Sequence, residues 1–187
     1  MEAFSDAVIA IVLTIMVLEL KTPHSADLEA LRPLLPVFLT YVLSFIYLGI
    51  YWNNHHHMLQ ATRRVNGKVL WANLHLLFWL SLVPFVTAWM GENHFAQVPT
   101  AVYGVVLLGA AISYTILQTV IVHHDRGENE LLAEAVGSDL KGKLSMVAYV
   151  LAIPLAFVSQ WIAGLIYLGV AIAWLIPDPR IERKIDI

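Results

Sequence analysis

The chain has 187 residues, of which 59% are hydrophobic and 13% are charged, and its formal net charge is −3. Its mean hydropathy is +0.71. Soluble domains carry roughly 25% charged residues, so this composition excludes an ordinary soluble protein and indicates an integral membrane protein. The slightly acidic balance gives no sign of a nucleic-acid partner. The absence of cysteine excludes disulfide bonds and thiolate metal sites.

Six apolar stretches follow one another along the chain. Each is long enough to cross the roughly 30 Å hydrocarbon core at about 1.5 Å per residue. A single helix over 144–176 would be about 50 Å long, well beyond that core, so we predict a break near Ser159 and Gln160. We therefore predict an all-α membrane protein with one domain, residues 1–187, of six transmembrane helices. The predicted spans lie at about 3–20, 36–54, 69–90, 98–121, 143–159 and 161–176.

The basic residues are distributed unequally between the two sides that six spans define. One side receives nine of them, whereas the other receives only Lys21 and Arg32. Basic residues accumulate in the cytoplasmic loops of membrane proteins, so we predict that both termini face the cytoplasm. The nine are Arg63, Arg64, Lys68, Arg126, Lys141, Lys143, Arg180, Arg183 and Lys184.

Polar residues gather at one depth of the predicted bundle, near its cytoplasmic side. Phe4, Ser5 and Asp6 open the first span, and a carboxylate at the mouth of a span is a functional-site hypothesis by default. Counted along the predicted helices, four further polar side chains share this level, so we predict one polar cluster. Its predicted members are Ser5, Asp6, Asn53, Asn54, Asn73 and His75.

Two roles for this polar cluster stay open on the sequence alone. Hydrogen bonds between helices are common in membrane proteins, which favours a structural network that holds the first three helices together. The alternative is a direct role in transport. Asp6 and His75 could also form a proton-sensitive pair, because an imidazole titrates near neutral pH.

The rest of the first helix carries an apolar stripe. Ile11, Thr14 or Ile15, and Leu18 follow one another at intervals of three or four residues, which places them on one face. Such a stripe can simply pack against lipid or neighbouring helices. Periodicity alone therefore does not identify a pore.

The three consecutive histidines His55, His56 and His57 suggest a metal site at first sight. Successive helical residues point about 100° apart, however, so one ion cannot collect all three. We interpret the triplet as a solvated or interfacial helix end and predict no metal site.

The run from Phe4 to Leu18, FSDAVIAIVLTIMVL, closely resembles the first helix of the transmembrane protein 175 family, the endosomal and lysosomal potassium channels and their bacterial relatives. The whole chain resembles one six-helix unit of that family. Animal members resemble two such units fused. A single unit of this size resembles a bacterial member, and the resemblance then implies a homotetramer in the bacterial inner membrane.

The resemblance implies a potassium-permeable cation channel whose central pore is lined by the first helix of every subunit. By position after the Phe4-Ser5-Asp6 signature, the constriction falls on Ile11, a polar ring on Thr14, and a further apolar ring on Leu18. His75 is similar to a family histidine that contacts this part of the first helix. The family also has an arginine four residues before the phenylalanine, a position outside the given sequence.

The residue types suggest how such a channel would work. A ring of Ile11 side chains would form a hydrophobic gate that opens and closes by wetting and dewetting. The sequence has no Thr-Val-Gly-Tyr-Gly filter, so we expect only modest selectivity for K⁺ over other monovalent cations. We expect no cofactor besides the permeant K⁺ and, in the absence of a catalytic motif, no enzyme activity. The alternatives are a proton-conducting channel or a secondary transporter that uses Asp6 and His75.

Overall fold

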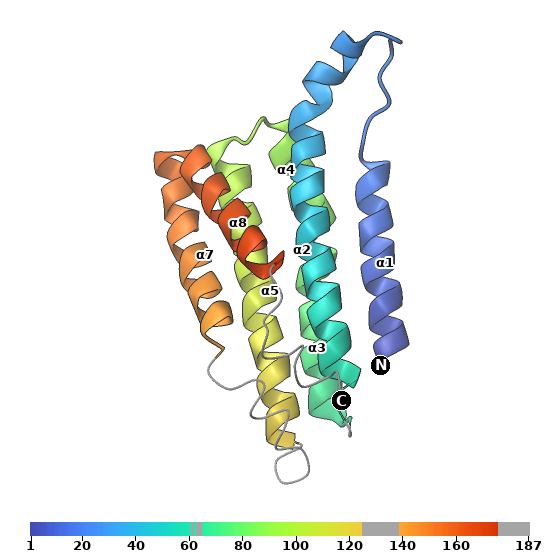
Figure 1. Ribbon diagram of the computed structural model, residues 1–187, viewed down its shortest axis with the longest axis vertical. Coiled ribbons are helices and arrows are strands. Elements are labelled where there is room, and N and C mark those ends of the chain that lie inside the picture. Colours follow the sequence, from blue (N-terminus) through green and yellow to red (C-terminus); the bar gives the residue numbers. More distant parts are fainter. Residues whose placement is uncertain (61, 63–64, 125–138, 176–187) are drawn as a thin grey trace.

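The computed structural model of the protein describes residues 1–60, 62, 65–124 and 139–175, and the regular secondary structure within these ranges is helical (Figure 1). Figure 1 shows the long helices side by side along the longest axis of the molecule. A short 3₁₀ helix, η1, leads directly into α2. The elements are α1 (Glu2–Leu18), η1 (Leu28–Leu34), α2 (Leu35–Gln60), α3 (Gly67–Ser81), α4 (Val83–Glu92), α5 (Gln97–His124), α7 (Leu140–Val158) and α8 (Gln160–Leu175).

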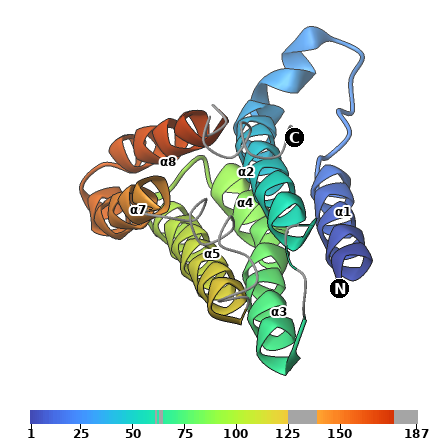
Figure 2. The same ribbon diagram turned by 60° about the horizontal axis from the view of Figure 1, so that its bottom comes forward.

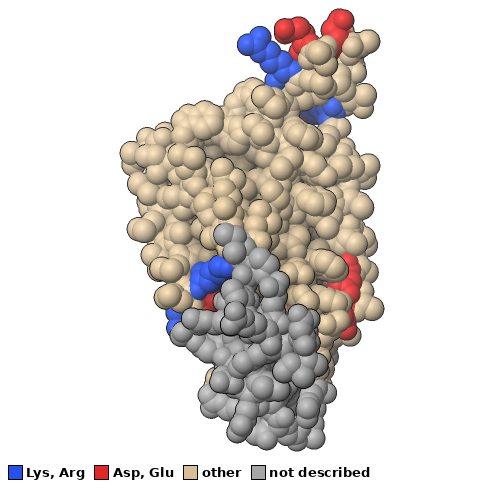
Figure 3. All heavy atoms as spheres, viewed as in Figure 1, with Lys and Arg blue, Asp and Glu red and all other residues tan. Residues whose placement is uncertain are grey.

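The surface is that of a multi-pass membrane protein. Charged side chains gather towards the two ends of the view in Figure 3, and a broad uncharged band separates them. Four helical stretches of the described chain are long and apolar enough to cross a membrane: Leu28–Gln60, Gly67–Glu92, Gln97–His123 and Leu140–Val158. The two shorter helices, α1 and α8, each reach about 25 Å. That they also cross the membrane stays a prediction.

Two interruptions divide the apolar stretches of the sequence. α3 ends at Ser81 and α4 begins at Val83, with Pro84 in the first turn of α4. Proline is tolerated there because the backbone N–H groups of a first turn have no hydrogen-bond partner within the helix. The second interruption is at Ser159, whose extended backbone (φ −157°, ψ 114°) separates α7 from α8. It lies where the length of 144–176 predicts a break.

The helices form a bundle with α1 at one side and α7 and α8 at the other (Figure 2). α1 packs against α2, α3 and α4. α5 lies more centrally, in contact with α3, α4, α7 and α8. The N-terminal helix is therefore a peripheral element of the subunit.

Buried hydroxyl groups connect the central helices to one another. The Ser44 hydroxyl in α2 lies 2.6 Å from Thr87 Oγ1 in α4 and 2.9 Å from the Tyr103 hydroxyl in α5. The Tyr47 hydroxyl donates to the backbone carbonyl of Tyr167 in α8 at 2.6 Å. Each of these buried polar groups finds a partner on another helix, so their hydrogen bonds fix how α2, α4, α5 and α8 pack.

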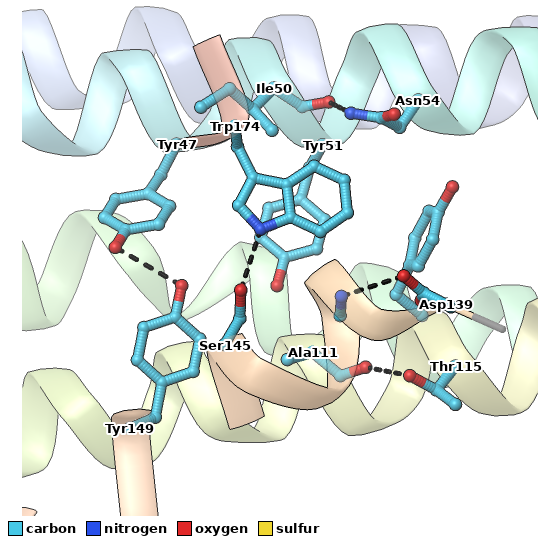
Figure 4. A pocket seen from close by; sticks show the side chains of 12 residues that line it. Tyr47, Ile50, Tyr51, Asn54, Ala111, Thr115, Asp139, Ser145, Tyr149 and Trp174 are labelled. Atoms are coloured by element: carbon cyan, nitrogen blue, oxygen red, sulfur yellow. Dashed lines mark hydrogen bonds between the residues drawn. The ribbon is translucent and has the colours of Figure 1, made fainter. Parts of the chain in front are cut away.

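A small cavity lies between α2, α5, α7 and α8 (Figure 4). Its volume is about 40 Å³. Tyr47 and Tyr149 meet at one end through their hydroxyls, 3.3 Å apart, and Trp174 Nε1 donates to Ser145 Oγ at 2.8 Å. The cavity belongs to the interior of the subunit, on the far side of α2 from α1.

Close helix packing around α5 depends on glycine. A side-chain carbon at Gly109 would overlap the indole ring of Trp79 in α3, and one at Gly104 would overlap the Tyr167 hydroxyl. These two glycines therefore serve contacts within the subunit.

Candidate functional site

One face of α1 anchors the helix to the bundle. Ser5, Ile9, Val12 and Met16 are its buried residues, and their spacing of three or four places them on one side of the helix. Their partners lie on α2, α3 and α4. The absence of Gly and Pro from Glu2–Leu18 and an acidic residue, Glu2, in the first turn favour the helix itself.

Another face of α1, about 130° around the helix from the anchored one, carries an exposed stripe, which we call the outer stripe. It consists of Phe4, Ile11, Thr14, Ile15 and Leu18. Phe4 and Ile11 are each 57% exposed, Ile15 is 40% exposed and Leu18 is 80% exposed. Thr14 is exposed as well. A continuous apolar stripe of this kind indicates a surface that other chains or lipid must cover.

Thr14 is the polar member of the outer stripe, and its hydroxyl is already engaged as a donor. Thr14 Oγ1 donates to the backbone carbonyl of Ile11 at 2.8 Å. A hydroxyl has one proton and two lone pairs. The Thr14 oxygen therefore faces its surroundings as an acceptor.

A buried hydrogen-bond chain ties the N-terminal end of α1 to α2 and α3. Asn73 Nδ2 donates to Ser5 Oγ at 2.9 Å, and Asn73 Oδ1 lies 2.7 Å from His55 Nε2. All three side chains are almost fully buried. Because Asn73 Oδ1 only accepts, His55 carries its proton on Nε2. The structure thus brings Ser5 and Asn73 together, as the sequence predicts, and adds His55.

His55 is a member of this hydrogen-bond chain that the sequence does not predict. Residues 55–57 are predicted as a solvated helix end, whereas His55 is fully buried. The sequence does not indicate which side of α2 faces α3. The neighbouring Asn54, a predicted member of the cluster, is turned about 100° away along α2. Its side-chain nitrogen donates to the Ile50 carbonyl of its own helix at 2.8 Å.

Asp6, the second polar residue of the signature, has a partner on α2. Trp52 Nε1 donates to Asp6 Oδ1 at 2.9 Å. The carboxylate is partly exposed. It lies at the same end of α1 as Ser5 but belongs to a separate hydrogen-bonded pair.

His75 lies apart from this polar group, so the prediction of one cluster is wrong for this residue. It follows Asn73 by two positions, a rotation of about 200° around α3, and so faces α5. Its Nε2 accepts from Trp79 Nε1 at 3.1 Å, and its Nδ1 lies 3.2 Å from Ser113 Oγ. The proposed Asp6–His75 pair does not form in this subunit.

The other end of α1 is tied by an ion pair beyond the helix. Lys21 Nζ lies 2.7 Å from Glu92 Oε1 at the end of α4. The hydrogen bond and the charge of Glu92 raise the pKa of Lys21 above its ordinary value. Both side chains are exposed, so the pair contributes little to stability.

The chain is similar to known potassium channels over most of its length. The family model described as endosomal/lysosomal potassium channel TMEM175 matches residues 1–84. A potassium channel of Chryseobacterium sp. (strain P1-3) is 55% identical over 185 residues, which cover 99% of this chain and 96% of that protein. A potassium channel of Streptomyces collinus is 31% identical over 168 residues, which cover 84% of this chain and 82% of that protein.

A solved structure is similar in fold. It is the crystal structure of a lysosomal potassium-selective channel TMEM175 homolog from Chamaesiphon minutus, with a TM-score of 0.78 and 28% sequence identity, covering 94% of each chain. The family match includes α1, α2 and α3, the helices that carry the buried chain from Ser5 to His55. The protein is therefore a member of the TMEM175 family, a family of ion channels and not of enzymes.

Proposed function

We propose that the protein is a potassium-permeable, modestly selective cation channel that assembles as a homotetramer around a central pore lined by α1. The observation that carries this proposal is the outer stripe, which runs along a peripheral helix on a different face from the anchored one. A helix held on one side only can present its other side to a symmetry axis. The relatives named potassium channels support the same conclusion.

The narrowest part of the proposed pore is a ring of Ile11 side chains. Ile11 lies near the middle of α1 and is 57% exposed within the subunit. Four such side chains on an axis exclude water when they approach closely and pass a partly hydrated cation when they separate. The ring is then a hydrophobic gate, and Ile15 and Leu18 continue the apolar wall.

Thr14 supplies the polar element of this wall. Its proton is held by the Ile11 carbonyl, so its oxygen offers lone pairs to a cation in the pore. The selectivity of such a ring is modest, because a hydroxyl ring does not replace the full hydration shell as a cage of carbonyls does.

Asp6 is placed to act on ions before they enter the proposed pore. It lies at the cytoplasmic end of α1, where a partly exposed carboxylate raises the local concentration of cations. The unequal distribution of Lys and Arg supports a cytoplasmic location for this end and for both termini, in the inner membrane of a bacterium. A proton relay from Asp6 to His75 has no such support, since His75 is bonded to Trp79 and Ser113.

The proposal is tested by flux in liposomes that contain the purified protein. We expect the wild-type protein to pass K⁺ in large, voltage-driven amounts, and Ile11→Asn to pass more K⁺ with weaker discrimination against Na⁺. Ile112→Asn is the matched control, because Ile112 is an exposed isoleucine on α5, away from α1. Unchanged flux in Ile11→Asn would contradict the gate, and saturable, coupled uptake would favour a transporter.

The assembly is tested separately by mass. The native mass of the protein in nanodiscs is expected to be about four times the chain mass of 20.9 kDa. A single subunit under conditions that support flux would overturn a pore on a symmetry axis.

A further inference from the structure

Three potential metal ligands meet at the cytoplasmic end of α1, outside the buried Ser5 chain. Glu2 and Asp6 are one turn apart on α1, and His56 lies opposite them on α2. One donor atom of each residue lies within 4.8 Å of the donor atoms of the other two. His56 Nδ1 and Glu2 Oε1 are already 3.1 Å apart.

These separations suit a small divalent ion. A tetrahedral ion bound at about 2.1 Å holds its donor atoms roughly 3.4 Å apart. The side chains of Glu2 and Asp6 need only small rotations to reach that spacing. One imidazole nitrogen with two carboxylate oxygens is a donor set for zinc and similar first-row metals, whereas calcium and magnesium prefer oxygen ligands alone.

The neighbouring side chains hold the three ligands in the required orientation. Trp52 Nε1 donates to Asp6 Oδ1 at 2.9 Å, which leaves the other carboxylate oxygen available. The indole ring of Trp52 also stacks on the His56 ring, with centroids 5.6 Å apart and planes 26° from parallel. Outer contacts of this kind fix the ligands of metal sites.

The two nitrogens of His56 have different surroundings. Nε2 lies 2.9 Å from the Gln60 side-chain amide, which can accept from Nε2–H once the amide is rotated to present its oxygen. Nδ1 is buried and makes no well-directed hydrogen bond, although Glu2 lies close. Nδ1 is therefore the nitrogen free to bind a metal, in the tautomer that Gln60 would stabilise.

We propose that Glu2, Asp6 and His56 bind one divalent transition-metal ion of the Zn²⁺ type in each subunit, with water in the fourth position. Of the three consecutive histidines, only the middle one is used, in keeping with the 100° between neighbours on a helix. The bound ion joins the first two turns of α1 to α2. Its effect on ion flux, unlike its binding, rests on the proposed function of α1.

Binding is tested with Co²⁺ and Zn²⁺ on tag-free protein in nanodiscs. We expect Co²⁺ to give the visible absorption bands of a tetrahedral complex at one ion per subunit, and Zn²⁺ to displace it. Glu2→Gln and His56→Phe are expected to weaken binding about tenfold or more. The phenyl ring in His56→Phe keeps the stacking on Trp52, and His57→Phe is the control in the neighbouring residue.

The results separate the two proposals. Equal Co²⁺ binding by wild type, Glu2→Gln and His56→Phe would overturn the site. The absence of a tetrahedral complex in the wild type would overturn it as well, and would indicate that His56 and the carboxylates only contact one another. If His56→Phe fails to fold, Glu2→Gln decides. If binding behaves as expected but the metal-free protein conducts no cations, the channel proposal fails and the metal site stands. If both stand, Zn²⁺ should alter K⁺ flux in the wild type and not in Glu2→Gln.

Discussion

α5 and α1 are both apolar helices, yet they are held in different ways. α5 is in contact with α3, α4, α7 and α8. Its polar contacts with other helices are distributed along its length, from Tyr103 bonded to Ser44 to Ser113 bonded to His75. α1 has its polar contacts with other helices near its N-terminal end, at Ser5 and Asp6, and just beyond its C-terminal end, at Lys21.

The difference shows which part of the subunit is a scaffold and which part is available for other contacts. The middle turns of α1 are anchored by the apolar residues Ile9, Val12 and Met16. Packing alone therefore holds the segment that carries Ile11 and Thr14. A segment of this kind can shift with less loss of hydrogen bonding than α5 can.

The largest expected effect separates the two faces of α1. Ile9 is 1% exposed and Ile11 is 57% exposed. Ile9→Asn places an amide among apolar neighbours and is expected to lower the free energy of unfolding by about 3 kcal/mol. Ile11→Asn should change it by less than about 0.5 kcal/mol. Thermal unfolding in detergent, followed by tryptophan fluorescence, measures both, and equal losses would show that the two faces do not differ.

The second effect concerns α5, the scaffold helix, and its packing against α3. Gly109→Ala places a methyl group against the Trp79 ring and is expected to cost about 2 kcal/mol of stability through overpacking. Gly49→Ala in α2 is the matched control, because no atom lies within 4 Å of the new methyl. The control should be neutral or gain up to about 1 kcal/mol from helix propensity. A tolerated Gly109→Ala would mean that α3 and α5 can separate easily.

A smaller effect is expected at the buried attachment of α1. Asn73→Leu leaves Ser5 and His55 without their shared partner and should cost about 1 kcal/mol, since hydrogen bonds between helices in membranes are individually weak. Unfolding in a titration with SDS gives the change. Asn53→Leu, at an exposed position of α2, serves as the control, and a loss of the same size there would count against the buried chain as an anchor.

The smallest effect is expected at the ion pair beyond α1. Glu92 raises the pKa of Lys21, so the pair contributes its stability fully below the ordinary pKa of Lys21 and loses it as pH rises through the raised value. Glu92→Gln should therefore have a slightly lower thermal midpoint than the wild type at pH 8, and this difference should vanish in strongly alkaline solution. A difference that grows with pH would contradict this sign.

From the sequence, the depth of a residue in the bundle could be predicted better than the side of the helix on which its side chain lies. Hydropathy predicted where the apolar stretches lie, the length of 144–176 predicted a break near Ser159 and Gln160, and counting residues along the helices placed Ser5 and Asn73 at one level. Which side of a helix faces a neighbour depends on how the helices pack. His75 shares the level of Asn73 but faces α5, and His55 is buried although a polar run surrounds it.

The hydroxyl contacts of the scaffold were beyond sequence reasoning for a related reason. Tyr47, Tyr103 and Tyr167 lie in apolar runs of three different helices, and no spacing in the chain connects them. Their hydroxyls find partners only once the helices are packed. The outer stripe of α1, in contrast, was predicted from its period, but its exposure required the structure.

In the proposed pore, the hydrogen bond within α1 from Thr14 to the Ile11 carbonyl would decide whether Thr14 can contact cations or anions. A free alcohol can turn to suit either sign, with its proton towards an anion or its oxygen towards a cation. With its proton donated to the backbone, the Thr14 oxygen resembles an ether oxygen in a crown ether, which coordinates metal ions and has no proton to donate to chloride. Rejection of anions would then follow from the helix backbone itself, without a charged residue at that depth.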